Sequence, residues 1–113
     1  MLTKYDKLEY IAPRTKYQIF EIIRRLEPEI RALWVSRLAV FGSCARGEDR
    51  PDSDVDILVQ FSMGSNTFER FLALSELLES SLGRRIELVT TEALSPFIGP
   101  HILAEAQDVI RAA

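Results

Sequence analysis

Residues 37–61 read RLAVFGSCARGEDRPDSDVDILVQF. Residues 37–41 are mostly apolar and too few for a helix, and they end at Gly42, so they predict a buried strand that enters a tight turn. The polar residues 48–53 predict a loop. Residues 54–61 alternate between two faces, which predicts a second strand with a period of two.

Further elements are predicted on both sides of these two strands. Apolar residues at helical spacing predict an amphipathic helix over about 13–34, which Pro28 is expected to kink or split. A second helix is expected over about 67–82, a third strand over 85–90 and a last helix over about 101–111. Helices and strands that alternate in this way predict an α/β (α+β) domain with a small sheet.

Length and composition limit the class of protein. The chain has 113 residues with 47% hydrophobic content, which predicts a single domain over residues 1–113 with a catalytic core at about 37–90. Fourteen basic and seventeen acidic residues give a net charge of −3, so no direct nucleic-acid binding is expected. Cys44 is the one cysteine, and no apolar run is long enough for a signal peptide or a membrane span, so we expect a cytoplasmic protein with no internal disulfide.

A candidate site lies where the two central strands flank the turn and the loop. With a period of two, Asp54 and Asp56 project from the same face, where their charges repel unless a cation such as Mg²⁺ binds them. Gly42 permits close approach of the backbone to a phosphate, and the Ser43 hydroxyl can donate a hydrogen bond. Arg46 could contact the phosphate or brace the carboxylates of the loop.

A third acid, Glu87, lies on the predicted strand at 85–90 between two apolar residues. It could complete a metal site or take the proton from an attacking hydroxyl, and the alternative is an edge-strand acid that discourages sheet-to-sheet pairing. With two bound metals, one would activate the attacking hydroxyl and the other would neutralise a leaving pyrophosphate. This arrangement predicts transfer of a nucleoside monophosphate.

The motif also resembles a known family. Gly42-Ser43, ten intervening residues, Asp54-Val55-Asp56 and a later strand acid look like the minimal nucleotidyltransferases of the DNA polymerase β superfamily, most of all the MntA-type antitoxins. The resemblance implies a nucleotidyltransferase fold, a small mixed β-sheet flanked by helices. It also implies an enzyme that uses ATP and Mg²⁺ to adenylylate a tyrosine of a partner HEPN-domain toxin.

The resemblance assigns a role to each residue of the motif. It makes three acids the catalytic and metal-binding residues: Asp54, Asp56 and Glu87. It makes the turn of Gly42 and Ser43 the part that binds the phosphates of the nucleotide. We also include Arg46 among the predicted nucleotide-binding residues, from its charge and its position after the turn. One departure is Glu87, because the family commonly has aspartate there and glutamate is longer by one methylene group.

Two other functions remain open beside protein adenylylation. The first is a catalytically weak binding module of the same fold, which neutralises its partner by occlusion through the apolar face of the first or the last helix. The second is a small-molecule adenylyltransferase. The nucleobase preference, and whether the protein forms a homo-oligomer or a hetero-oligomer, are equally open.

Overall fold

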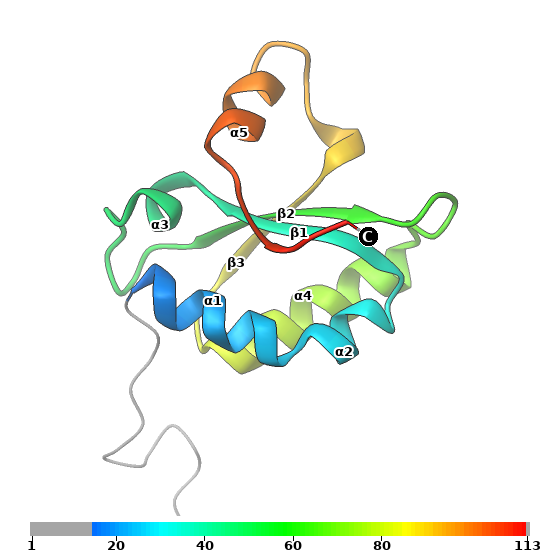
Figure 1. Cartoon of the computed structure of the whole chain (residues 1–113), viewed down its shortest axis with the longest axis horizontal. Helices are drawn as coiled ribbons and strands as arrows, with labels where there is room; N and C mark the ends of the chain where they lie inside the picture. The colour runs from blue at the N-terminus through cyan, green and yellow to red at the C-terminus, as the bar shows by residue number, and fades with distance from the viewer. Residues whose placement is uncertain (1–14, 113) are drawn as a thin grey trace, which may run out of the picture.

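The computed structural model describes residues 15–112, in which four strands form one sheet in the order β3-β2-β1-β4 (Figure 1). The strands are β1 (Val35–Phe41), β2 (Val55–Phe61), β3 (Ile86–Thr90) and β4 (Gln107–Ile110). β1 runs antiparallel to β2 and to β4, whereas β2 and β3 are parallel. The sheet is therefore mixed, as the family resemblance implied.

The alternating pattern of β2 separates the two faces of the sheet. Val55, Ile57 and Val59 are fully buried against the helices on one face. Leu58 packs on the other face in a smaller cluster with Ala39. Figure 1 shows the same division. One face carries α1 (Lys16–Arg25), α2 (Glu27–Arg31) and α4 (Phe68–Leu82), and the other carries α5 (Gly99–Glu105).

The helix expected over 13–34 is two short helices, α1 (Lys16–Arg25) and α2 (Glu27–Arg31). Pro28 lies in the first turn of α2, where its missing N–H costs nothing, so the chain is split there as expected. The helical structure ends at Arg31 and not at residue 34, and residues 13 and 14 lie outside the described part of the chain.

The second expected helix is α4 (Phe68–Leu82), within one residue of its predicted bounds. Thr67 caps its first turn by accepting a hydrogen bond from the Arg70 N–H, and Gly83 ends it in a left-handed conformation. Leu74, Leu78 and Leu82 form its buried face. No helix in residues 15–112 is long and apolar enough to cross a membrane.

The prediction of a helix over about 101–111 is wrong in its second half. A short helix, α5 (Gly99–Glu105), ends before Ala106, which has extended backbone angles, and β4 follows. Val109 and Ile110 are β-branched and buried, and β4 pairs along the edge of β1, where Asp108 makes a 2.7 Å ion pair with Arg37. Sheet pairing decides the conformation of a segment whose apolar spacing fits a helix equally well.

Candidate active site

The sheet places two of the three predicted acids opposite each other, and the third lies two residues before one of them in the chain. Asp54 immediately precedes β2, Asp56 is the second residue of β2, and Glu87 is the second residue of β3. β2 and β3 pair in parallel with Asp56 opposite Glu87. Because adjacent strands lie about 4.8 Å apart, side chains at paired positions share one face and are close neighbours.

Negative charge predominates around Asp56. Burial raises the pKa of the Asp56 carboxyl above its ordinary value, and the carboxylates of Glu87, Asp54 and Glu105 raise it further. Arg46 acts in the opposite direction but does not cancel these effects. A cation bound among these groups would therefore favour the ionised form of Asp56.

The donor chemistry fits a hard divalent cation such as Mg²⁺. The three predicted ligands are carboxylates, the oxygen donors that Mg²⁺ prefers. Asp54 Oδ1 is buried and accepts no hydrogen bond in the described residues, although it forms an ion pair with Arg85 Nε at 3.1 Å. The Arg85 side chain is 80% exposed, so this ion pair is weak. In residues 15–112 no three His, Cys, Asp or Glu side chains already form a metal-holding group, so metal binding would require side-chain movement.

The turn after β1 lies directly against Asp56. Phe41 pairs with Asp56 across the sheet, and Gly42 follows it as the first residue of α3 (Gly42–Arg46). Gly42 has a φ of 71°, and a Cβ atom added there would overlap the Asp56 Oδ2. The predicted phosphate turn and the predicted metal ligands are therefore adjacent, and only glycine fits between them.

Gly42→Ala should lower the free energy of unfolding more than Gly47→Ala does. Both glycines have a φ of 71°, so alanine costs roughly 1–2 kcal/mol of backbone strain at either position. An added Cβ meets nothing within 4 Å at Gly47 but collides with Asp56 at Gly42. We expect about 1–3 kcal/mol of additional loss for Gly42→Ala in urea titrations. Equal losses for the two variants would contradict this account of the turn.

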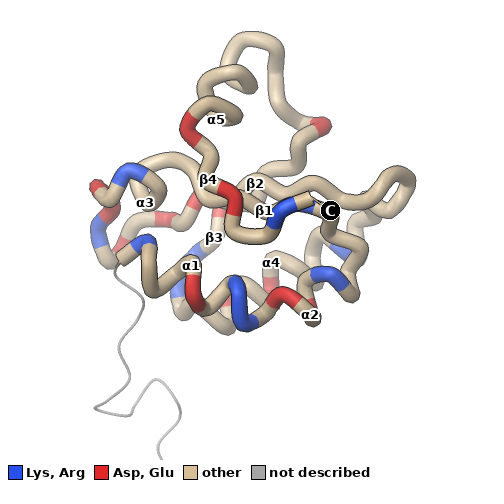
Figure 2. Tube along the Cα trace, viewed as in Figure 1, with Lys and Arg blue, Asp and Glu red and all other residues tan. Residues whose placement is uncertain are grey.

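Arg46 braces carboxylates from two segments. Its Nε donates to Glu48 Oε1 at 2.6 Å, and its Nη1 donates to Glu105 Oε2 at 2.9 Å. The Gly42 N–H donates to Glu105 Oε1 at 2.8 Å. Figure 2 shows acidic and basic positions close together around α3. These contacts are those of the bracing role, and contact of Arg46 with a phosphate stays a prediction. The sequence does not reveal Glu105, because an acid at the end of a helix 59 residues from Arg46 carries no local signal.

A buried ion pair holds the loop between α3 and β2. Arg84 Nη1 lies 2.8 Å from Asp49 Oδ2, and the two side chains are only 2% and 3% exposed. Arg84 Nη2 also donates to the carbonyl oxygens of Arg50 and Ser53, at 2.9 and 2.7 Å. Ser53 precedes Asp54, so Arg84 fixes the loop that positions the first acid. Sequence reasoning missed this role as well.

The Cys44 thiol is a packing group. It is fully buried, and burial raises its pKa to about 11, with the Asp49 carboxylate contributing next. A thiol with that pKa stays protonated at neutral pH and is a poor nucleophile. The structure therefore supports packing and not catalysis at this position.

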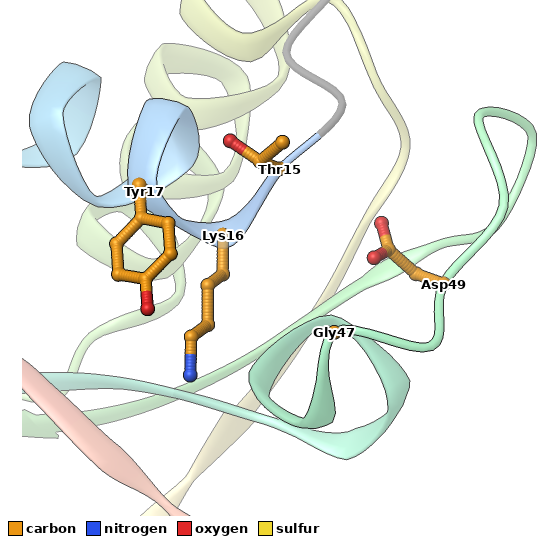
Figure 3. Close-up of a pocket in the computed structure, with 5 residues that line it drawn as sticks. All are labelled: Thr15, Lys16, Tyr17, Gly47 and Asp49. Atoms are coloured by element: carbon orange, nitrogen blue, oxygen red, sulfur yellow. The ribbon is translucent and has the colours of Figure 1, made fainter.

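A separate pocket of about 260 Å³ lies between the start of α1 and the end of α3 (Figure 3). Five residues line it: Thr15, Lys16, Tyr17, Gly47 and Asp49. None of them is a predicted site residue, and Gly47 is at the opposite end of α3 from Gly42. We place the candidate site at the carboxylates, because the charge and the unsatisfied oxygen are found there.

Comparisons with known proteins show the family of the chain. The model of the nucleotidyltransferase domain family matches residues 23–109. The protein adenylyltransferase MntA of Thermococcus cleftensis is 38% identical over 96 residues, which cover 84% of this chain and 96% of that protein. A candidate protein adenylyltransferase of Methanocaldococcus jannaschii is 37% identical over 92 residues, covering 81% of this chain and 98% of that protein.

Solved structures give the same result for the fold. A candidate minimal nucleotidyltransferase is 36% identical with a TM-score of 0.65, covering 78% of this chain and 93% of that chain. A toxin–antitoxin structure with AMP-PNP, 20% identical, has a TM-score of 0.67 and covers 82% of this chain and 73% of that chain. The second likeness concerns the fold alone. The nucleotidyltransferase fold expected from the sequence is thereby confirmed, and the chain is an enzyme that belongs to the nucleotidyltransferase domain family.

Proposed function

We propose that this protein is an Mg²⁺-dependent adenylyltransferase that moves AMP from ATP to a HEPN-type toxin and so acts as its antitoxin. The observation that carries the proposal is the placement of Asp56 opposite Glu87 and against Gly42. Support comes from the relative in Thermococcus cleftensis, a protein adenylyltransferase. Further support is a structure of the same fold, a tri-AMPylated HEPN toxin of Shewanella oneidensis in complex with MNT antitoxin, with a TM-score of 0.59 and 16% identity.

In this proposal each side chain has a defined task. Asp54, Asp56 and Glu87 hold Mg²⁺, which when bound neutralises charge on the triphosphate and its pyrophosphate leaving group. The Gly42 N–H and the Ser43 hydroxyl donate hydrogen bonds to phosphate oxygens, and Arg46 supplies a positive charge.

The transfer itself is a displacement at phosphorus. A hydroxyl oxygen of the partner protein forms a bond to the α-phosphorus while the bond from that phosphorus to the pyrophosphate oxygen breaks. The proton of the hydroxyl passes to the Glu87 carboxylate, which acts as the general base. The products are the adenylylated partner and pyrophosphate.

Incubation of the purified protein with ATP, Mg²⁺ and the product of the adjacent gene tests the proposal. Intact-mass measurement should detect one or more added AMP groups on the partner. The same mixture with EDTA in place of Mg²⁺ should leave the partner unmodified. An unmodified partner in the complete mixture, while the two proteins form a complex, would contradict the proposal.

Replacing Glu87 tests the role of the third acid. Glu87→Gln keeps the shape of the side chain but removes its charge and basicity, so AMP transfer should slow by roughly 10²–10⁴-fold. Glu87→Asp restores the acid that the family commonly has, and its rate should stay within about tenfold of the wild-type rate. Initial rates from intact mass measure both. A wild-type rate for Glu87→Gln would contradict a catalytic role and would favour the alternative, an edge-strand acid that discourages sheet-to-sheet pairing.

A binding module that neutralises its partner by occlusion is the second candidate. It is favoured by large apolar side chains that are exposed in and just before α5: Phe97, Ile98 and Leu103. Cell protection distinguishes the two functions, because a double variant, Asp54→Ala with Asp56→Ala, retains occlusion but loses transfer. Protection by this double variant would favour the binding module.

A further inference from the structure

Glu105, near the C-terminal end of the chain, contacts two groups of the candidate site. It is the last residue of α5, and its two carboxylate oxygens have different partners. Oε1 accepts the Gly42 N–H at 2.8 Å, and Oε2 accepts from Arg46 Nη1 at 2.9 Å. A single carboxylate thus joins the backbone of the turn to the guanidinium that follows it.

Both donors are groups that the proposed function assigns to the nucleotide phosphates, so the present inference rests on that function. The Gly42 N–H has one hydrogen, and it points at Glu105. A phosphate oxygen and a carboxylate oxygen cannot both take that hydrogen in good geometry. The two anions would also repel each other at that distance.

We propose that Glu105 is an internal anion that occupies the phosphate position of the turn and is displaced when the triphosphate binds. The Glu105 side chain is 34% exposed, so it has solvent into which it can rotate. The Glu105 carboxylate also adds to the negative charge around Asp56. Its departure therefore frees two donors and reduces repulsion among the acids.

As a consequence, the protein binds ATP more weakly than it would if Glu105 did not contact the turn. Every binding event first breaks a charge-assisted contact between Glu105 and Arg46 and a hydrogen bond between Glu105 and Gly42. Glu105 thus lowers nucleotide affinity without contacting the bound nucleotide. A residue that only braced the fold would have the opposite effect, because its removal would weaken binding.

Calorimetric titration of ATP in the presence of Mg²⁺ and without partner protein measures this effect. We expect Glu105→Ala to bind ATP about tenfold more tightly than the wild-type protein, because a charged hydrogen-bond contact no longer competes. Glu105→Gln keeps an acceptor for Gly42 but loses the charge, and should show a smaller gain.

Glu48→Gln is the matched control. Glu48 is the other carboxylate partner of Arg46, through Nε, but it makes no contact with the Gly42 N–H in the described residues. Glu48→Gln weakens one of the two carboxylate contacts of Arg46 and leaves Glu105 on both Arg46 and the Gly42 N–H, so it should raise the ATP affinity less than Glu105→Ala does. An equal gain for the control would overturn the claim that Glu105 occupies the turn.

A measurement on the wild-type protein removes any dependence on variant folding. The carboxyl ¹³C resonance of Glu105 and the amide resonance of Gly42 should both shift on addition of ATP with Mg²⁺. Unchanged resonances at saturating ATP would overturn the inference, as would equal or weaker binding by Glu105→Ala. If neither the wild-type protein nor Glu105→Ala bound ATP, the proposed function itself would fail, and the inference with it.

Discussion

Asp56→Asn should reduce the rate of AMP transfer by on the order of a thousandfold. Asp56 is the acid that touches both halves of the site, since it lies against Gly42 and opposite Glu87. Loss of its charge removes a metal ligand, and metal-ion stabilisation of a transition state supplies several kcal/mol, at 1.36 kcal/mol for each tenfold change in rate. Rates from intact mass at saturating ATP and Mg²⁺ measure the effect.

The same variant should be more stable than the wild-type protein when Mg²⁺ is absent. The folded state raises the pKa of Asp56, first through burial and then through Glu87, Asp54 and Glu105. A carboxyl group whose pKa is higher in the folded than in the unfolded protein stabilises the fold when the pH is below its unfolded pKa, about 3.9. This stabilisation is lost as the pH rises through the pKa of the folded protein. The stability advantage of Asp56→Asn in urea unfolding should therefore grow as the pH rises from about 4 to 7.

Asp52→Asn is the control for both measurements. Asp52 lies two residues before Asp54 in the same loop and is exposed. The Asp52→Asn substitution removes one negative charge but no candidate ligand. The transfer rate and the unfolding free energy of this variant should therefore match those of the wild-type protein. Added Mg²⁺ should stabilise the wild-type protein and Asp52→Asn, but not Asp56→Asn. Wild-type transfer by Asp56→Asn would exclude the proposed metal site.

Arg84→Met should lower the free energy of unfolding by about 3–5 kcal/mol. Its partner Asp49 is 3% exposed, and removing one member of a buried ion pair leaves the other charge buried without compensation. The carbonyl oxygens of Arg50 and Ser53 also lose a donor. Urea unfolding monitored by circular dichroism measures the loss.

The neighbouring arginine provides a matched control for this loss. Arg85 also faces an aspartate, Asp54, but its side chain is 80% exposed, so Arg85→Met should cost at most about 1 kcal/mol. Combining Arg84→Met with Asp49→Leu should recover part of the lost stability, because no buried charge then remains. Similar losses for Arg84→Met and Arg85→Met would contradict the structural role assigned to Arg84.

The elements with a strong local pattern could be predicted from the sequence. β2 places apolar residues at every second position, and α4 combines helical spacing with a glycine end at Gly83, so both lie within one residue of their expected bounds. β4 could not be predicted, because the spacing of Val109 and Ile110 suits a helix as well as a strand. Only the available edge of β1 decides between them.

In the candidate site, too, the sequence predicts the residues that belong to a local motif and misses those that act through contacts distant in the chain. Gly42, Asp54 and Asp56 lie within fifteen residues of one another, and each carries a chemical signal in its neighbours. Glu105 and Arg84 act through contacts with residues 31–63 positions away in the chain. Such contacts follow from the packing of the sheet and leave no trace in a local pattern.

A crystal structure with Mn²⁺ and a non-hydrolysable ATP analogue tests the central claim most directly. Mn²⁺ takes the oxygen ligands that Mg²⁺ takes, and its anomalous scattering locates it without ambiguity. We predict a peak bound by Asp54, Asp56 and Glu87, with a phosphate oxygen accepting from the Ser43 hydroxyl. A peak elsewhere, or phosphates away from the Gly42 turn, would contradict the assignment of these residues to one metal and nucleotide site.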